Sequence, residues 1–121
     1  NVSTESAYPY KGRDQICKNI TGTFTISKYV AGRGCPALAA AIRKGPVSVA
    51  VDASNWSSYK TGILNKCGTS LNHGVLLVAS TTTYWKIKNS WGTSWGEGGY
   101  IRLATGNTCG VCAYAGVVPT L

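Results

Sequence analysis

Residues 88–100 read KNSWGTSWGEGGY, and this stretch decides the fold of the chain. Its glycines give the backbone the freedom to turn sharply beside bulky indole side chains. Residues 84–88 on one side and 100–103 on the other alternate apolar with cationic or polar side chains. That alternation is typical of half-buried antiparallel strands. The Gly-Trp loop is therefore expected to connect two strands of an antiparallel sheet.

The only histidine, His73, lies sixteen residues before Asn89, at the start of an apolar run (74–79) that predicts a buried strand. Taken alone, a histidine in that place favours a structural role. If its strand pairs with the next one as a hairpin, His73 and Asn89 lie side by side. The Asn89 oxygen then accepts the proton of one imidazole nitrogen, which fixes the tautomer and aims the other nitrogen outward. Trp91 and Trp95 would cover that bond and exclude water.

The remaining elements predict an α+β fold. A helix is expected over residues 36–44, because a proline occupies its first turn and two cations and a glycine end it. Strands are expected at residues 24–29 and 47–51, and a loop at 80–83. One helix followed by short strands indicates a small antiparallel sheet or barrel. No linker is visible, so residues 1–121 are expected to form a single domain.

Composition excludes some classes of function. The chain has 44% hydrophobic residues, enough for a core, but no apolar run of the ~18 residues that a membrane span requires. Its formal charge of +8 comes from cations scattered along the sequence. Nucleic-acid binding requires clustered charge with interleaved aromatic residues, so a basic, solvated surface is the better interpretation.

The cysteines and three glycosylation sequons indicate a secreted glycoprotein or one in a lysosome- or vacuole-like compartment. The sequons begin at Asn1, Asn19 and Asn55. Residues 1–5 are polar, so any leader peptide is expected to have been removed already. Five is an odd number of cysteines, so one must stay free or pair outside the chain. The five are Cys17, Cys35, Cys67, Cys109 and Cys112.

The spacing Asn-Ser-Trp-Gly, two residues, Trp-Gly, two residues, Gly-Tyr, after a His-Gly strand, resembles the second half of papain and its relatives in the cathepsin L and bromelain group. Tyr8-Pro9-Tyr10, residues 45–50, Cys67-Gly68 and the tail 109–112 also follow the family's order. The resemblance covers nearly the whole chain. It implies the antiparallel, barrel-like right-hand domain of the papain-like cysteine proteases, with no metal or organic cofactor.

The resemblance also implies catalytic roles. His73 would be the acid–base partner of a cysteine thiolate, and Asn89 would orient its ring. Trp91 would shield the bond between them, and Trp95 would lie on the leaving-group side of the cleft.

Three further positions match the family's substrate cleft. Ala50 and Leu71 match residues that line the pocket for the second substrate residue, which implies a hydrophobic preference there, and the tail near residues 114–117 would form its floor. Asn72 stands where relatives usually carry an aspartate, which would weaken electrostatic support for an imidazolium. Residues 79–80 are Ala-Ser where relatives usually carry Gly-Tyr, so the hairpin between His73 and Asn89 is expected to differ in shape.

The family's nucleophile is not expected within these residues. It lies in a Cys-Gly-Ser-Cys-Trp-like segment roughly 130 residues before the histidine, and only 72 residues precede His73. The implied activity is a Cys-His-Asn endopeptidase acting on peptides and proteins. The expected partner is the N-terminal half or light chain of the same protease, to which Cys17 would be linked unless it stays unpaired. By the same resemblance, Cys67–Cys112 and Cys35–Cys109 are the preferred disulfides, with the swapped pairing left open.

Other classes of function remain as alternatives. Cys109 and Cys112 form a C-x-x-C of the thiol-redox type, but in a β-rich tail rather than at a helix start. Cys67, His73 and these two cysteines also have a spacing that would permit zinc. The chain would otherwise be a catalytically silent fragment or pseudoenzyme, a binding module whose exposed apolar wall promotes homodimers.

Overall fold

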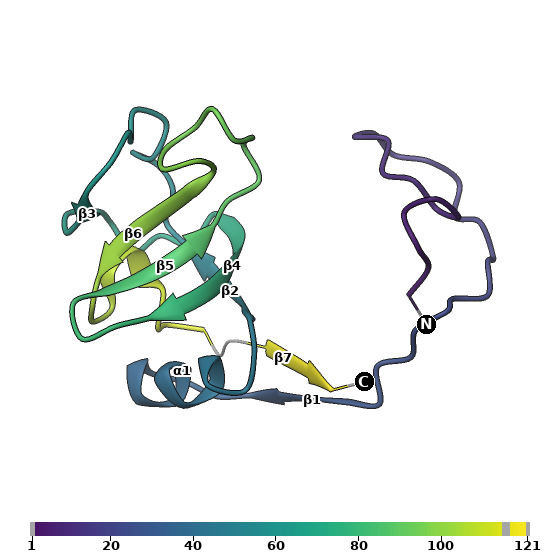
Figure 1. The fold of residues 1–121 in the computed structure, drawn as a ribbon, viewed down its shortest axis with the longest axis horizontal. Coiled ribbons are helices and arrows are strands. Elements are labelled where there is room, and N and C mark those ends of the chain that lie inside the picture. Colours follow the sequence, from purple (N-terminus) through teal and green to yellow (C-terminus); the bar gives the residue numbers. More distant parts are fainter. Residues whose placement is uncertain (1, 115–116, 121) are drawn as a thin grey trace. The chain divides into compact units, whose positions relative to one another are not determined.

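The computed structural model describes residues 2–114 and 117–120. Asn1 of the first sequon and residues 115–116 of the expected pocket floor lie outside the described residues. The elements, in chain order (Figure 1), are β1 (Lys28–Ala31), α1 (Cys35–Ile42), β2 (Val47–Val51), β3 (Ile63–Leu64), β4 (His73–Ser80), β5 (Tyr84–Lys88), β6 (Tyr100–Ala104), the short 3₁₀ helix η1 (Thr108–Gly110) and β7 (Val117–Thr120).

The chain divides into two compact units. Asn1–Tyr29 with Pro119–Leu121 forms unit 1, and Val30–Val118 forms unit 2. Within unit 1, Val2 and Phe24 form an isolated antiparallel bridge. The expected strand 24–29 is present only at its end, where β1 begins. The expectation that residues 1–121 form a single domain stays a prediction. The candidate site lies wholly in unit 2.

The strands form a seven-stranded sheet in the order β1-β7-β2-β4-β5-β6-β3. The pairings of β2 with β4, β4 with β5 and β5 with β6 are antiparallel, whereas β3 runs parallel to β6. The α+β prediction is confirmed. The sheet does not close into a barrel, because β1 and β3 are its two edges.

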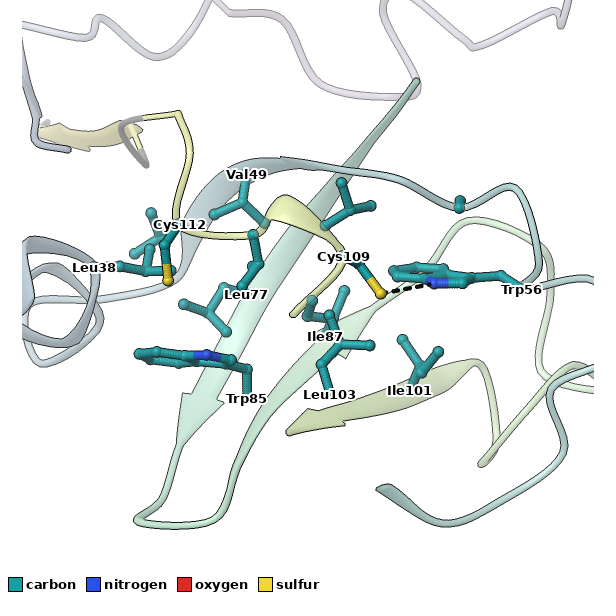
Figure 2. Close-up of a cluster of buried hydrophobic side chains, with 14 of the residues drawn as sticks. Leu38, Val49, Trp56, Leu77, Trp85, Ile87, Ile101, Leu103, Cys109 and Cys112 are labelled. Atoms are coloured by element: carbon teal, nitrogen blue, oxygen red, sulfur yellow. Dashed lines mark hydrogen bonds between the residues drawn. The ribbon is translucent and has the colours of Figure 1, made fainter. Parts of the chain in front are cut away.

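One face of the sheet forms the core, as a period of two residues requires. Along β2 the three valines are buried, while Ser48 between them is exposed. The core face also carries Leu77 of β4, two residues of β5 and two of β6, and α1 adds Leu38. Figure 2 shows this cluster with Leu38 toward one end and Trp56 toward the other. The buried members labelled there are Leu38, Val49, Trp56, Leu77, Trp85, Ile87, Ile101, Leu103, Cys109 and Cys112.

Helix α1 starts one residue earlier and ends two residues earlier than the sequence predicts. A proline occupies its first turn, and the residues after Ile42 form tight turns instead of a further helical turn. The amide of Lys44 donates to Ala41 O, and Gly45, with φ of +150°, takes the chain out toward β2. The helix itself ends at Ile42 with Arg43 as its C-cap, so the expected glycine cap at Gly45 is wrong: Gly45 lies beyond the cap, in the turn that follows.

The β4–β5 hairpin contains a bulge. The register shifts between Leu77 and Ala79, so two residues of β4 face one step of β5. The turn that follows is held by Thr81, whose Oγ1 accepts hydrogen bonds from the amides of Thr83 and Tyr84. The predicted loop at 80–83 is therefore confirmed for residues 81–83, since β4 includes Ser80. Within the described residues, no helix is both long enough and apolar enough to cross a membrane.

The disulfides link Cys35 to Cys112 and Cys67 to Cys109, with Cα–Cα distances of 4.9 and 5.1 Å. The preferred pairing from the sequence is wrong, and the swapped pairing is present. The reason is η1, which carries Cys109 toward the loop before β4, while Cys112 returns to the start of α1, where Gly34 N donates to Cys112 O. Cys17 is free and exposed.

Replacing both Cys35 and Cys112 by alanine is expected to lower the free energy of unfolding by about 2–5 kcal/mol. The bond joins residues 77 apart, so its loss frees a long loop in the unfolded chain. Urea unfolding measures the change, and Cys17→Ala is the control, with a change within ~0.5 kcal/mol. A peptide map of the unreduced protein that links Cys67 to Cys112 would contradict the assignment.

Candidate active site

The β4–β5 register places His73 and Asn89 on the same face of the sheet. Leu76 pairs with Lys88, so the next position, Asn89, lies opposite Val75. His73 is two residues from Val75 and shares its face. This is the same face that carries the core, so the two side chains lie where the core ends.

The two side chains are hydrogen-bonded. His73 Nε2 lies 2.8 Å from Asn89 Oδ1. The Ser90 amide, which can only donate, is 2.8 Å from the same oxygen. This second bond identifies the atom as the acceptor, so Nε2 carries the proton and donates it. The tautomer is therefore set by Asn89, and Nδ1 is the nitrogen left with a free lone pair. The predicted juxtaposition is present.

Asn89 is buried, with 8% of its surface exposed. The backbone N–H of Asn89 also donates to Gly99 O at 3.0 Å, which ties the start of the Gly-Trp loop to its end. The side-chain nitrogen, Nδ2, is the one buried side-chain N or O atom in the described part of the chain that has no hydrogen-bond partner. An unsatisfied buried donor costs free energy, so the rest of the fold holds Asn89 in place.

Aromatic rings surround the imidazole. The Trp91 ring stacks on His73 with centroids 5.2 Å apart and an interplanar angle of 26°. Trp95 meets Trp91 edge to face at 5.1 Å. Trp91 is 41% exposed, so it covers the imidazole from the solvent side. The structure thus brings together His73 and the three residues that the sequence singled out around it.

Trp56 was not predicted, although it supports the whole cluster. It is completely buried, stacks on Trp95 with ring centroids 6.1 Å apart, and makes a T-shaped contact with His73 at 6.3 Å. Trp95 Nε1 donates to Trp56 O, while Trp56 Nε1 points at Cys109 Sγ (Figure 2). In the sequence Trp56 is the middle residue of the sequon Asn55-Trp56-Ser57, and nothing in that motif indicates a buried aromatic residue.

An ion pair holds the far end of the Gly-Trp loop. Arg102 of β6 donates to both carboxylate oxygens of Glu97, at 2.9 and 2.6 Å. Thr61 Oγ1 and Gly62 N donate to the same carboxylate. The loop must approach closely here, since a Cβ on Gly96 would lie 2.6 Å from Tyr100 O. These contacts fix the loop that carries both tryptophans.

Three further residues were expected at the substrate cleft, namely Ala50, Leu71 and Asn72. Ala50 of β2 pairs with Gly74, and Leu71 packs against Gly110. A shallow, mostly apolar hollow beside Asn89 is lined by Ser48, Val49, Gly74, Val75, Leu76, Lys88, Asn89 and Ser90. Neither Ala50 nor Leu71 lines it. Asn72 turns its side chain away from the ring: Oδ1 accepts from Ala53 N, and Nδ2 donates to Ser54 Oγ.

The disulfides overturn the redox and zinc hypotheses. Cys109 and Cys112 bond to different partners, so the C-x-x-C does not form its own disulfide, and both are buried. The same bonds occupy the three cysteine sulfurs of the zinc set. Every cysteine between residues 30 and 118 is half of a disulfide, so unit 2 offers no thiolate to His73.

Comparison with known proteins agrees with this geometry. The model of the papain family cysteine proteases matches residues 1–118. Cathepsin L 2 of Paramecium tetraurelia is 50% identical over 109 residues, which are 88% of this chain and 35% of that protein. Fruit bromelain of Ananas comosus is 38% identical, over 99% of this chain and 38% of its own length.

Solved structures of the same group are also similar. The bromelain protease of Ananas comosus in complex with the E64 inhibitor superposes with a TM-score of 0.86 at 38% identity, covering 98% of this chain and 62% of that one. A Carica candamarcensis cysteine protease reaches a TM-score of 0.89 at 35% identity, over 98% of this chain and 61% of that one.

A Gly-Trp loop that covers a His–Asn pair at the end of an antiparallel sheet is typical of the right-hand domain of a thiol protease. The chain belongs to the papain family of cysteine proteases. It spans little more than a third of the length of these curated relatives. The sequence interpretation of a papain-like, C-terminal portion is confirmed.

Glu97→Gln is expected to destabilise the protein in a pH-dependent way. Its hydrogen bond with Arg102 lowers the pKa of Glu97 to about 2, from an ordinary 4.5. Because the folded-state pKa is the lower one, the stabilisation is complete above that ordinary value and is lost as pH falls through about 2. We expect the variant to lose about 2 kcal/mol at neutral pH, with the difference closing toward pH 2. Urea midpoints across this range test it, and a difference independent of pH would contradict it.

Proposed function

We propose that this chain supplies the histidine and asparagine of a Cys-His-Asn cysteine endopeptidase whose nucleophilic thiolate comes from outside these 121 residues. The observation that carries the proposal is the hydrogen bond from His73 Nε2 to Asn89 Oδ1, with the oxygen fixed by Ser90 N. It leaves Nδ1 as the nitrogen that exchanges protons with a reacting group. Family membership supports the same assignment.

The mechanism follows from the free nitrogen. A thiolate paired with protonated His73 attacks the peptide carbonyl carbon, and Nδ1 then gives its proton to the leaving amine. Water, deprotonated by the same nitrogen, releases the acyl group from sulfur. Throughout the cycle Nε2 keeps its proton and its bond to Asn89, because that amide oxygen accepts from the imidazole and the imidazolium alike. Trp91 excludes water from this bond and so strengthens it.

The partner in this proposal is the N-terminal half or light chain of the same protease. Cys17 is exposed and unpaired, so it is available for a disulfide to that partner. Two disulfides within the chain are typical of proteins made on the secretory route. A secreted or lysosome- or vacuole-like location, with glycans at exposed sequons, is the corresponding proposal for the compartment.

A catalytically silent binding module is the second candidate. The observation that favours it is the exposure of apolar side chains such as Trp91 and, in unit 1, Tyr10 and Ile16, which are 86% and 92% exposed. Surfaces of this kind promote association, including homodimers.

Labelling the protein as purified from its source separates the two candidates. An epoxide that alkylates activated thiolates is added, and intact mass is measured before and after reduction. A labelled second polypeptide alongside this chain supports the protease. This chain alone, unlabelled and without peptidase activity, would refute the protease and leave the binding module.

In the active two-chain protein, His73→Ala is expected to lower kcat/KM by at least about 10³-fold, because the thiolate loses its acid–base partner. Asn89→Ala is expected to have a smaller effect, about 10–100-fold, since the imidazole remains but loses its orientation. Hydrolysis of a fluorogenic peptide measures both. Thr82→Ala, in the exposed turn at the other end of the hairpin, is the control and keeps wild-type activity. Unchanged hydrolysis by the His73 variant would contradict the assignment.

We also propose a hydrophobic preference at the second substrate residue, with Ala50 and Leu71 lining that pocket. Both are apolar, so a substrate with leucine there is expected to exceed one with aspartate by at least about tenfold in kcat/KM. Replacing Ala50 by Asp should reverse or abolish the ratio. Equal rates for the two peptides would contradict the preference.

A further inference from the structure

Asp52 lies at the junction between two strands of the site. Val51, the last residue of β2, pairs with His73, the first residue of β4. Asp52 directly follows the one and Asn72 directly precedes the other, so these two residues occupy the next step of the ladder. Asn72 N donates to Val51 O at 3.0 Å, which extends the pairing past the strand ends.

The Asp52 carboxylate is buried, with only 5% of the residue exposed, and hydrogen-bond donors converge on it. Ser54 donates to Oδ1 from its hydroxyl at 2.6 Å and from its amide at 3.1 Å. Asn72 Nδ2 approaches the same oxygen at 3.5 Å. Ser70 N donates to Oδ2 at 3.0 Å. Gly68 packs so closely that a Cβ there would collide with the carboxylate.

The bonds from Ser70 and Asn72 and the close packing of Gly68 hold the segment that leads into β4, whereas the bonds from Ser54 hold the carboxylate itself. Ser70 and Asn72 lie immediately before His73, and Gly68 follows the disulfide at Cys67. On the other side, Asp52 N donates to Cys109 O at 2.8 Å. Four donors favour the ionised carboxylate, and the hydrogen bonds from Ser54 are the main reason that the pKa of Asp52 lies below its ordinary value.

We propose that Asp52 is a positioning residue for His73: through Ser70 and Asn72, its carboxylate fixes the entry into β4 and so aims the imidazole at Asn89. It does not touch the ring itself. The inference rests on the proposed function for its catalytic meaning, but the geometry that it explains exists without a thiolate. It also accounts for Asn72, whose side chain serves the Asp52 network rather than the imidazole.

The single histidine makes the proposal directly measurable. A long-range ¹H–¹⁵N spectrum of the chain labelled with ¹⁵N-histidine contains one imidazole, and the nitrogen shifts of its neutral form distinguish the two tautomers. The wild-type chain is expected to carry its proton on Nε2. Asp52→Asn keeps the shape of the side chain, but it replaces one acceptor oxygen by an NH₂ group that faces hydrogen-bond donors. In this variant the population of the minor tautomer, which carries the proton on Nδ1, is expected to rise about five- to tenfold. That change corresponds to the free energy of one net hydrogen bond.

Glu97→Gln is the matched control. Glu97 is the other acidic residue of unit 2, and it also accepts several hydrogen bonds, but it holds the Gly-Trp loop to β6 instead of the entry into β4. Because Glu97 holds the loop that carries Trp91, and not the segment that carries His73, this variant is expected to lose stability and to shift the tautomer ratio less than Asp52→Asn does. Asn72→Ala should raise the minor tautomer as Asp52→Asn does, and the double variant should add little, because both act through one network.

The outcomes are decisive in each case. A folded Asp52→Asn chain with the wild-type tautomer ratio overturns the proposal, and so does a Glu97→Gln chain with an equal shift. If Asp52→Asn does not fold, Asn72→Ala and Ser54→Ala decide it, and an unchanged ratio in both overturns it. A correct histidine signature in a two-chain protein that hydrolyses nothing would refute the proposed function and leave the role of Asp52 intact.

Discussion

The antiparallel pairing of β4 with β5 is the constraint on which the rest of unit 2 depends. Its register decides which side chains face the core and, by continuing along the same face, which meet at the end of the sheet. Leu77 and Ile87 are completely buried on that face, and His73 and Asn89 lie on it further along. A slip of one residue would turn both pairs outward together. Core and candidate active site are therefore specified by the same hydrogen-bond ladder.

Both acidic side chains of unit 2 hold loop segments in place. Asp52 fixes the segment before β4, and Glu97 fixes the loop after Asn89, through hydrogen bonds in both cases and an ion pair with Arg102 in the second. Both segments lead to the His–Asn pair, one from each strand.

Strands and the central pair were predictable because they depend on local patterns. Residues 47–51 and 84–88 were predicted with the bounds that the structure has, since alternation of apolar and polar side chains is a property of the strand itself. The approach of His73 to Asn89 followed from hairpin spacing. The expected strand 24–29 was largely wrong, because its pairing depends on residues distant in sequence, such as Val2.

By itself, the sequence determined the α+β class, the strands of the hairpin and the family, because residue order carries both the periodicity and the motif spacing. Only the tertiary structure decided which cysteines pair, since Cys109 and Cys112 are too close in sequence for spacing to distinguish their partners. It also revealed Trp56 beneath the aromatic cluster and Asp52 behind His73. Neither residue carries a local signal, because its role arises from contacts with segments that folding alone brings together.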